Sequence, residues 1–420
     1  MRWAPKITDF PRYPVVAGTA LLAVGVSLSW WANTDISPLF ENVMIRRGEV
    51  WRLLTSVLPH VGVLHLVFDV YWFWIFGSLI EETLGHVRTA ALIVLFAVIP
   101  NAFEFALLEG GVGLSGVGYG LFGLLWVLSR KDARFSDAID SKTAQLFVGW
   151  FFLCIVATLA KVMQVANLAH GVGAITGVLT GFAITVPHRR VQAVGGITFL
   201  FIMSLWGSTI GRPRVNLSKT GGAEEAHLGY EALMANQDRD ALRWLQDAVA
   251  YRSPDPVSWY DLGIAYQRVG NYRASASAYQ AAAIRGDAAA QYIIGTLYLT
   301  GRDGFQKDYR SALDWCRKAA AQNDVDALNA LAWEYATSTD PAVRNPAVAL
   351  EYARKVAEIE GDKPIPNHLD TLAESYFAAG QFEQAVKTEQ QAISLSTDQA
   401  KGYFEASLKK YEHAAGVRKQ

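Results

Sequence analysis

The sequence has little of several things that would define its chemistry. It has only two cysteines, Cys154 in an apolar run and Cys316 far along the chain, so no disulfide framework is expected. Its 38 Lys and Arg residues nearly balance 39 Asp and Glu residues, and a net charge of −1 gives no overall signal for nucleic acid. His60 and His65 lie five residues apart, and no Cys/His cluster completes a ligand set, so we predict no metal site and no cofactor. The N-terminus lacks a clear small-residue cleavage site, which argues against a cleavable signal peptide.

Long apolar runs are abundant, and they are confined to the first half of the chain. Up to about residue 211 Trp, Phe and Gly accompany these runs, whereas from about residue 220 the chain is rich in Ala, Tyr and charge. A membrane-spanning helix needs about 20 mainly apolar residues. Seven candidate spans follow, at 15–32, 61–80, 90–108, 114–129, 146–160, 168–186 and 194–210. The fourth and fifth are short, which suits a position inside a bundle or beside a water-filled cavity.

Basic residues indicate which ends of the spans face the cytoplasm. They precede the first span and lie in alternate connections, all on one side of the membrane: Arg2, Lys6, Arg12, Arg88, Arg130, Lys131, Arg134, Lys142, Arg189 and Arg190. The exception is the connection after the first span, with Arg46, Arg47 and Arg52. Because this connection is long and rich in Trp and Leu, we expect a folded, partly embedded element there.

Three ionisable residues lie at membrane depth, where such groups are costly and by default functional. His65 and Asp69 are four residues apart and share one helix face, where the plain interpretation is a hydrogen-bonded pair that locks two helices. His170 starts a run with Gly173, Gly177 and Gly181, a four-residue spacing that allows a second helix to approach closely.

The partner expected for the His170 helix is the run at 113–120, which carries Gly113, Ser115, Gly116 and Gly120. A lone serine in such a run is usually structural, because its hydroxyl bonds back to the backbone. A serine beside a histidine, however, forms a nucleophile and its base. We therefore predict that Ser115 and His170 meet, with the Ser115 backbone N–H and His65 as donors to an oxyanion.

Six short motifs occur in order along these runs. They are Trp51-Arg52, the set His60, His65 and Asp69, the pair Glu81 and Gly85, Gly113-Leu114-Ser115-Gly116, Tyr119, and Ala169-His170 with Gly173 and Gly177. In these motifs, over about residues 15–186, the chain resembles the rhomboid family of intramembrane serine proteases.

The resemblance implies a serine endopeptidase that cleaves transmembrane helices within the lipid bilayer. Ser115 would be the nucleophile, His170 the general base, and His65 and Asp69 the oxyanion residues. The supporting residues would be Trp51, Arg52, Glu81, Gly113, Gly116, Tyr119, Gly173 and Gly177, with Tyr119 packed against the catalytic histidine.

Asp69 departs from the family pattern, which has Asn at this place. An ionised carboxylate would repel an oxyanion, whereas a protonated one donates a hydrogen bond; alternatively, Asp69 orients His65. We expect activity to rise on acidification or in Asp69→Asn. Two alternatives stay open beside the protease: a weak or inactive relative that binds membrane helices as a scaffold, and a transporter-like bundle.

The second half is repetitive. Pairs of residues recur at spacings near the 34-residue period of helix–turn–helix repeats: Leu228-Gly229, Leu262-Gly263, Ile294-Gly295, Leu331-Ala332 and Leu372-Ala373. The pattern resembles tetratricopeptide and Sel1-like repeats, and it predicts four to five helix pairs with a polar capping helix at 399–413. Such a solenoid would bind a protein or peptide on its concave surface.

The predicted fold class is all-α, a membrane bundle of six plus one spans followed by an α-solenoid. The predicted parts are a cytoplasmic segment at 1–14, the membrane domain at 15–211, a linker at 212–223 and the repeats at 224–413. We expect a multi-pass protein of a bacterial inner membrane. If the seventh run spans, which we favour, the repeats are extracytoplasmic; if it lies on the membrane surface, they are cytoplasmic.

Overall fold

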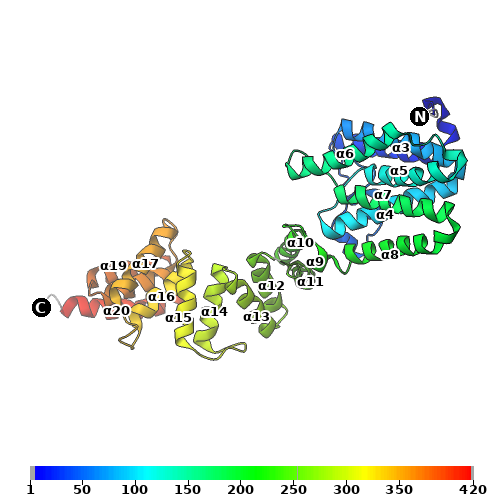
Figure 1. The fold of residues 1–420 in the computed structure, drawn as a ribbon. Coiled ribbons are helices and arrows are strands. Elements are labelled where there is room, and N and C mark those ends of the chain that lie inside the picture. Colours follow the sequence, from blue (N-terminus) through cyan, green and yellow to red (C-terminus); the bar gives the residue numbers. More distant parts are fainter. Residues whose placement is uncertain (1–4, 253, 418–420) are drawn as a thin grey trace. The chain divides into compact units, whose positions relative to one another are not determined.

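The structure is a computed structural model that describes residues 5–252 and 254–417. Within these residues the regular elements are helices, and no strand occurs. The helices form two compact units, Met1–Glu224 with Ala250–Ser253, and Glu225–Val249 with Pro254–Gln420 (Figure 1). The predicted all-α fold class is confirmed. The domain bounds predicted from the sequence stay predictions, and Arg2 lies outside the described residues.

Seven long helices form the first unit within the described residues, one for each predicted span. They are α1 (Pro14–Trp31), α3 (Val63–Leu84), α4 (His86–Leu107), α5 (Ser115–Lys131), α6 (Ser141–Leu159), α7 (Asn167–Thr185) and α8 (Arg190–Ser208). Among the described helices, six are long and apolar enough to cross a membrane, counting α8 from Pro187. The first unit is therefore an integral membrane bundle.

The two spans expected to be short differ from each other. Helix α5 has 17 residues. It is shorter than each of the six helices that are long and apolar enough to cross a membrane, as the sequence suggested. The prediction of a short fifth span was wrong, because α6 has 19 residues and starts at Ser141. Asp140 precedes this helix, and its carboxylate accepts a hydrogen bond from the Thr143 N–H at 2.8 Å, so a polar first turn extends the helix beyond the apolar run.

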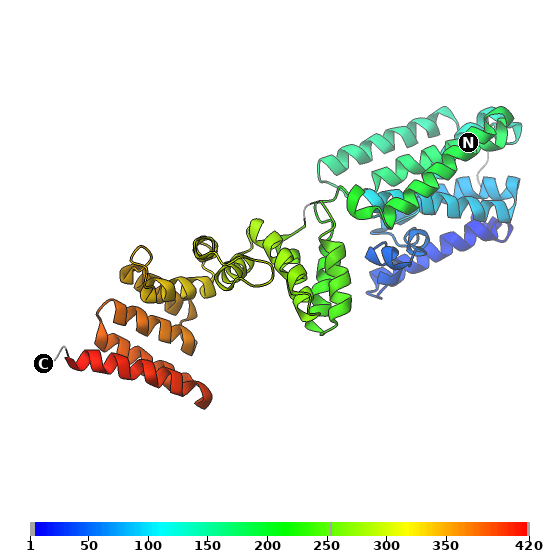
Figure 2. The ribbon, with the colours of Figure 1, turned by 90° about the horizontal axis from the view of Figure 1, so that it is seen from below.

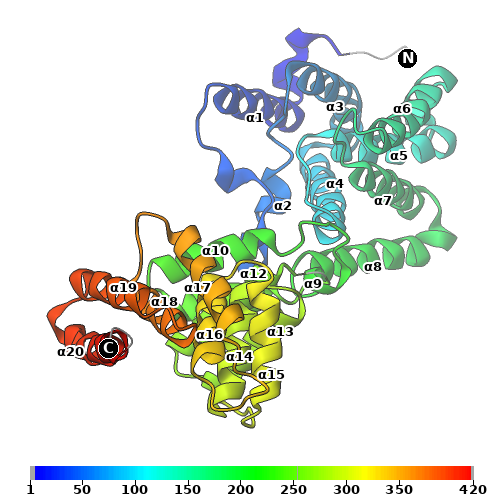
Figure 3. The same cartoon turned by 90° about the vertical axis from the view of Figure 1, so that its left-hand side faces the viewer.

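Helix α5 lies at the centre of the bundle, packed against α3, α4 and α7 (Figure 3). Its closest neighbour is α7, because glycines line the contact on both sides. A Cβ atom on Gly173 would collide with the carbonyl oxygen of Gly116, and one on Gly177 with that of Gly120. The missing side chains therefore set the distance between these two helices.

The connection between α1 and α3 is folded and includes the short helix α2 (Arg52–Thr55). Ile45 and Leu53 are fully buried in it, and they pack against Ala102 and Phe105 of the bundle. The Arg52 guanidinium is buried and donates to the Glu49 carboxylate at 2.6 Å and to the Ser37 carbonyl at 2.8 Å. Arg52 is thus used internally, and the Arg46 guanidinium donates to the Thr209 carbonyl at 3.3 Å, so these two arginines of the exception bind the protein itself.

Helix α8 runs back from the end of α7 to the end of α4. Beyond it lies the short helix α9 (Arg212–Val215), where the Arg212 guanidinium sits 3.9 Å over the Phe105 ring. The Asn216 amide donates to the Leu108 carbonyl at 2.9 Å, and the Leu217 N–H donates to the Leu107 carbonyl at 2.7 Å. The chain therefore leaves α8 beside the segment that leads into α5.

The second unit is a row of helices in which successive helices lie side by side (Figure 2). Its described helices are α10 (Ala223–Met234), α11 (Asp238–Ala248), α12 (Pro256–Arg268), α13 (Tyr272–Ile284), α14 (Ala288–Thr300), α15 (Tyr309–Ala320), α16 (Val325–Thr337), α17 (Pro346–Glu360), α18 (Pro366–Ala378), α19 (Phe382–Leu395) and α20 (Asp398–Val417). Small residues allow the helices of a pair to touch. At Gly263, for example, a Cβ atom would lie 2.5 Å from the Tyr279 ring.

The last helix differs from the polar cap that the sequence suggested. Phe404 is 1% exposed and Tyr411 is fully buried, and both belong to α20. The Tyr411 hydroxyl donates to the Glu374 carboxylate at 2.6 Å, and its ring packs against Phe377. One face of α20 is therefore part of the core. This face was not predicted because charged residues surround Phe404 and Tyr411 in the sequence.

Candidate active site

Ser115 is the first residue of α5, and the turn before it is held by backbone contacts. The Gly113 N–H donates to the Ser56 carbonyl at 3.1 Å, and the Leu114 N–H donates to His60 Nε2 at 3.3 Å. Gly113 has a φ of +107°, a conformation that glycine adopts without strain. A Cβ atom on Gly113 would also lie 2.8 Å from His65 Nε2, so a larger residue here would displace the His65 ring. The glycine thus permits the turn that presents Ser115.

The structure brings Ser115 and His170 together from helices α5 and α7. His170 Nε2 lies 2.7 Å from Ser115 Oγ, within hydrogen-bond distance. His170 is 3% exposed, and its Nδ1 has no hydrogen-bond partner among the described residues. With the ring proton on Nδ1, Nε2 accepts the Ser115 hydroxyl proton, which is the geometry of a base and its nucleophile.

Tyr119, one turn after Ser115, holds the His170 ring. The two rings are stacked, with centroids 4.6 Å apart and planes inclined by 24°. The Tyr119 hydroxyl donates to the Phe147 carbonyl on α6 at 3.0 Å, which fixes the tyrosine itself. Three helices therefore determine the orientation of one imidazole.

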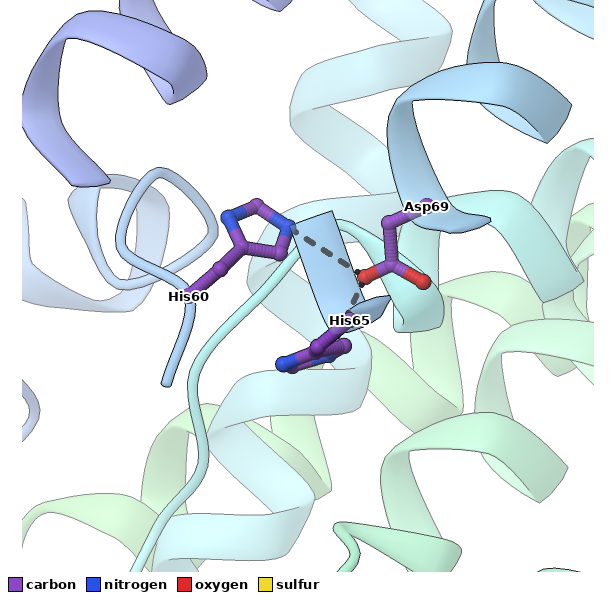
Figure 4. Close-up of side chains that lie close together, drawn as sticks. All are labelled: His60, His65 and Asp69. Atoms are coloured by element: carbon purple, nitrogen blue, oxygen red, sulfur yellow. Dashed lines mark ion pairs between the residues drawn. The ribbon is translucent and has the colours of Figure 1, made fainter. Parts of the chain in front are cut away.

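His65 and Asp69 lie on α3 beside the turn that precedes Ser115, where the sequence predicted the oxyanion residues. Asp69 is 6% exposed, and its Oδ2 lies 3.3 Å from both His65 Nε2 and His60 Nε2 (Figure 4). Backbone N–H groups in the first turn of α5 are free of intrahelical acceptors and add donors to this region. His60, His65 and Asp69 offer ligand atoms within 4.8 Å of one another. The prediction of no metal site considered only the two histidines, whereas Asp69 lies beside them as a third donor.

A cavity of about 1640 Å³ reaches both Ser115 and His170. One part of its wall is acidic, with Glu41, Glu104 and Glu109, and another part is apolar, with residues such as Phe68 and Trp150. Ser218 and Lys219, from the segment after α9, also line it. The cavity therefore has both acidic and apolar side chains in its wall beside Ser115 and His170.

Of three further predicted supporting residues, Arg52 and Glu81 bind backbone groups of the bundle, whereas Trp51 is exposed. Trp51 is 53% exposed at the start of α2, and Arg52 binds the connection after α1. The buried Glu81 carboxylate accepts hydrogen bonds from the Val15 N–H at 3.0 Å and the Val16 N–H at 2.9 Å. Glu81 thus caps the first turn of α1, whose N–H groups lack other acceptors.

Sequence reasoning missed two carboxylates next to the site. The Glu104 carboxylate on α4 accepts a hydrogen bond from the Ala169 N–H at 2.9 Å, in the turn of α7 that carries His170. The Glu41 carboxylate accepts one from the Gly111 N–H at 2.9 Å, and burial raises the pKa of Glu41 well above its ordinary value. An acidic residue inside the apolar run at 90–108 was the available signal for Glu104.

Two family models match the chain. The Rhomboid domain matches residues 47–187, and the Sel1 repeat matches residues 288–324 and 325–358. The rhomboid protease GlpG of Haemophilus influenzae is 33% identical over 136 residues, which are 32% of this chain and 70% of that protein. Rhomboid protease GlpG of an Enterobacter species is 30% identical over 148 residues, 34% of this chain and 51% of the relative, so the match spans about half of that protein.

Two solved structures are also similar. A Sel1 repeat protein from Oxalobacter formigenes has a TM-score of 0.35 and 20% identity, over 55% of this chain and 98% of that one. The tetratricopeptide domain of P58(IPK) has a TM-score of 0.27 and 13% identity, over 90% of this chain and 96% of that one. The resemblance stated from the sequence motifs is confirmed by the family models and by the relatives. The chain belongs to the rhomboid family of intramembrane proteases, and it carries Sel1 repeats in its second half.

Proposed function

We propose that the chain is an intramembrane serine endopeptidase that hydrolyses a peptide bond in a transmembrane helix. The single observation that carries this proposal is the 2.7 Å separation of Ser115 Oγ and His170 Nε2 inside the membrane bundle. Glycines on α5 and α7 make the pairing specific, because side chains there would separate the helices. Membership of the rhomboid family supports the same reaction.

The reaction follows from these two groups. Ser115 Oγ attacks the carbonyl carbon of the scissile bond while His170 Nε2 takes the hydroxyl proton. His170 then gives that proton to the leaving amine nitrogen, and the C–N bond breaks. Water hydrolyses the acyl-enzyme with His170 again as the base. The Ser115 backbone N–H and His65 stabilise the negative charge on the carbonyl oxygen.

Asp69 is unfavourable for the proposed reaction and favours a second candidate function, a scaffold that binds membrane helices. An ionised carboxylate beside His65 repels the oxyanion, which slows the reaction of a chain that otherwise carries the dyad. A weakly active or inactive protein that binds membrane helices as a scaffold is therefore the alternative. The two functions differ in whether Ser115 forms a covalent bond to a substrate carbonyl.

A transmembrane helix suits the cavity as a substrate. Its apolar wall accepts lipid-facing side chains, and its acidic region admits the water that hydrolysis needs. A helix in lipid keeps its backbone hydrogen-bonded, so the scissile segment must unwind to reach Ser115. We therefore expect small and helix-breaking residues near the cleaved bond.

The repeat unit is proposed to bind a protein or peptide partner or the substrate. The segment 216–220 leaves the membrane unit beside the entry to α5, and Ser218 lines the same cavity as Ser115. If this cavity opens to the extracytoplasmic side of a bacterial inner membrane, the chain enters its repeats on that side. A reporter fused to the C-terminus, active only outside the cytoplasm, tests the placement; activity of a cytoplasm-specific reporter would contradict it.

The proposed reaction is tested in liposomes that contain the full chain. Two single-span test proteins serve as substrates, one with a Gly- and Ala-rich stretch near the extracytoplasmic end of its helix and one with an all-Leu helix. We expect the wild type to cut the first faster than the second, and Ser115→Ala to cut neither. Mass spectrometry of the fragments locates the bond. Equal cleavage by wild type and Ser115→Ala would refute the proposal.

A further inference from the structure

Three donor atoms from two segments converge beside the turn that precedes α5. His60 comes from the connection before α3, whereas His65 and Asp69 come from the first two turns of α3 (Figure 4). Asp69 is 6% exposed, and its Oδ2 has no hydrogen-bond partner among the described residues, although it faces both imidazoles. A buried carboxylate oxygen with only these two 3.3 Å contacts is poorly compensated, and a cation between the three donors would compensate it.

We propose that His60, His65 and Asp69 form a zinc site whose occupation inhibits the protease. Two imidazoles and one carboxylate match the ligands of zinc sites that keep a fourth position open. Zinc binding is inferred from the positions of these three side chains alone, whereas the inhibition rests on the proposed protease function.

Two of the three distances between donor atoms fit this ion. Zinc lies about 2.0–2.2 Å from nitrogen and oxygen ligands, so two ligands of a tetrahedral site are about 3.3–3.6 Å apart. Asp69 Oδ2 lies 3.3 Å from His60 Nε2 and 3.3 Å from His65 Nε2. The donor atoms all lie within 4.8 Å of one another, and the His65 side chain is 31% exposed, so its ring has room to complete the site.

The surroundings of His60 prepare its Nε2 to be a ligand. His60 Nδ1 lies 3.0 Å from the Leu58 carbonyl, which accepts a hydrogen bond from the Nδ1–H, so the lone pair of the ring is on Nε2. Metal-binding histidines commonly hold their second nitrogen in this way. The Nε2 lone pair at present accepts the Leu114 N–H at 3.3 Å. Zinc bound to His60 Nε2 would therefore break the hydrogen bond from the Leu114 N–H, which holds the residue before Ser115.

Occupation also changes His65. An imidazole that binds zinc through Nε2 has no proton on that nitrogen, so it cannot donate to an oxyanion. Zinc would thus remove one oxyanion donor and release the Leu114 N–H from its acceptor. Both changes lower the reactivity of Ser115.

Binding is measured on the full-length Ser115→Ala protein in detergent, purified without a histidine tag. Titration calorimetry with Zn²⁺, and absorption spectra with Co²⁺ as the probe, should give one site with the intense bands of tetrahedral cobalt. Asp69→Asn removes one of three protein ligands and should weaken Zn²⁺ binding by more than about 100-fold, since loss of an outer partner alone costs 10–100-fold. His65→Gln, at a partly exposed position, should weaken Zn²⁺ binding by a similar factor. If Asp69→Asn does not fold, the affinity of His65→Gln tests the zinc site in its place.

The matched control is His368→Gln in the repeat unit. His368 Nδ1 lies 2.6 Å from the Glu360 carboxylate, and its Nε2 lies 3.8 Å from that of Asp326, so it is another histidine among acidic groups. This variant should bind Zn²⁺ like its parent. The proposal is overturned if the folded Asp69→Asn and His65→Gln proteins keep the parental affinity, or if His368→Gln loses it.

Inhibition is measured as the rate at which a fluorophosphonate labels Ser115 in the wild type. Zn²⁺ should slow labelling at the concentrations that fill the site, and it should leave the rate of Asp69→Asn unchanged at those concentrations. Labelling that Zn²⁺ accelerates or does not change would refute the inhibitory role. Absence of any labelling would instead refute the proposed function, while calorimetry still decides the zinc site.

Discussion

Replacement of Gly177 by alanine tests whether the α5–α7 contact sets the geometry of Ser115 and His170. A Cβ atom at this position would collide with the Gly120 carbonyl oxygen and would lie 2.7 Å from the Leu124 nitrogen. These are backbone atoms of α5, which cannot rotate away. Ordinary contact begins at 3.4 Å, so the two helices must separate by at least about 0.7 Å at this level.

The separation matters because Ser115 Oγ and His170 Nε2 are now 2.7 Å apart. A shift of this size carries the pair beyond the roughly 3.2 Å reach of a productive hydrogen bond. We expect Gly177→Ala to lower the rate of substrate cleavage about 10- to 100-fold, since a misplacement of 1 Å costs about 100-fold. The overpacked helices should also lose about 1–3 kcal/mol of stability.

The assay is cleavage of a single-span test protein in liposomes, with equal amounts of folded enzyme. The matched control is Gly195→Ala on α8, because a Cβ atom there would meet nothing within 4 Å. This control should keep the wild-type rate. Equal rates for the two alanine variants would refute the idea that the glycine contact positions the dyad.

Three further predictions concern carboxylates. Asp69→Asn, assayed with a chelator present, should cleave faster than the wild type because a neutral amide no longer repels the oxyanion; a slower variant would mean that Asp69 is needed as a carboxylate. Glu104→Ala should lose about 1–3 kcal/mol in thermal unfolding and cleave more slowly, since the Ala169 N–H loses its acceptor, whereas Glu104→Gln should lose less. Burial and the nearby Asp370 carboxylate raise the pKa of Glu389 to about 8, from an ordinary 4.5, so the folded repeat unit binds a proton that the unfolded chain releases. Stability of that unit should fall as the pH rises from about 4.5 to about 8, and Glu389→Gln should flatten this dependence in calorimetry.

Much of the fold was predictable because it follows from periodic and local signals. Apolar runs predicted the spans, and the four-residue spacing of Gly173 and Gly177 predicted a close helix contact. The recurrence of Leu-Gly and Leu-Ala pairs predicted the helical repeats. Each of these patterns lies within a single segment of the chain, so one sequence is enough to detect it.

The parts that were missed depend on contacts between distant segments. Glu104 meets the Ala169 N–H across 65 residues, and Glu41 meets the Gly111 N–H across 70. His60 precedes α3, and only the path of the chain into that helix brings its Nε2 to Asp69. The buried face of α20 was missed because Phe404 and Tyr411 stand alone among charged neighbours. Spacing along the chain contains none of this information.

Covalent labelling of Ser115 tests most directly whether this serine is a nucleophile activated by His170. The full chain in detergent is treated with a fluorophosphonate, and peptide mass spectrometry locates the label. If Ser115 is the nucleophile and His170 its base, we expect one phosphonylated residue, Ser115, with labelling abolished in Ser115→Ala and in His170→Ala. A folded wild type that takes no label, or a His170→Ala protein that is labelled as fast as the wild type, would contradict it.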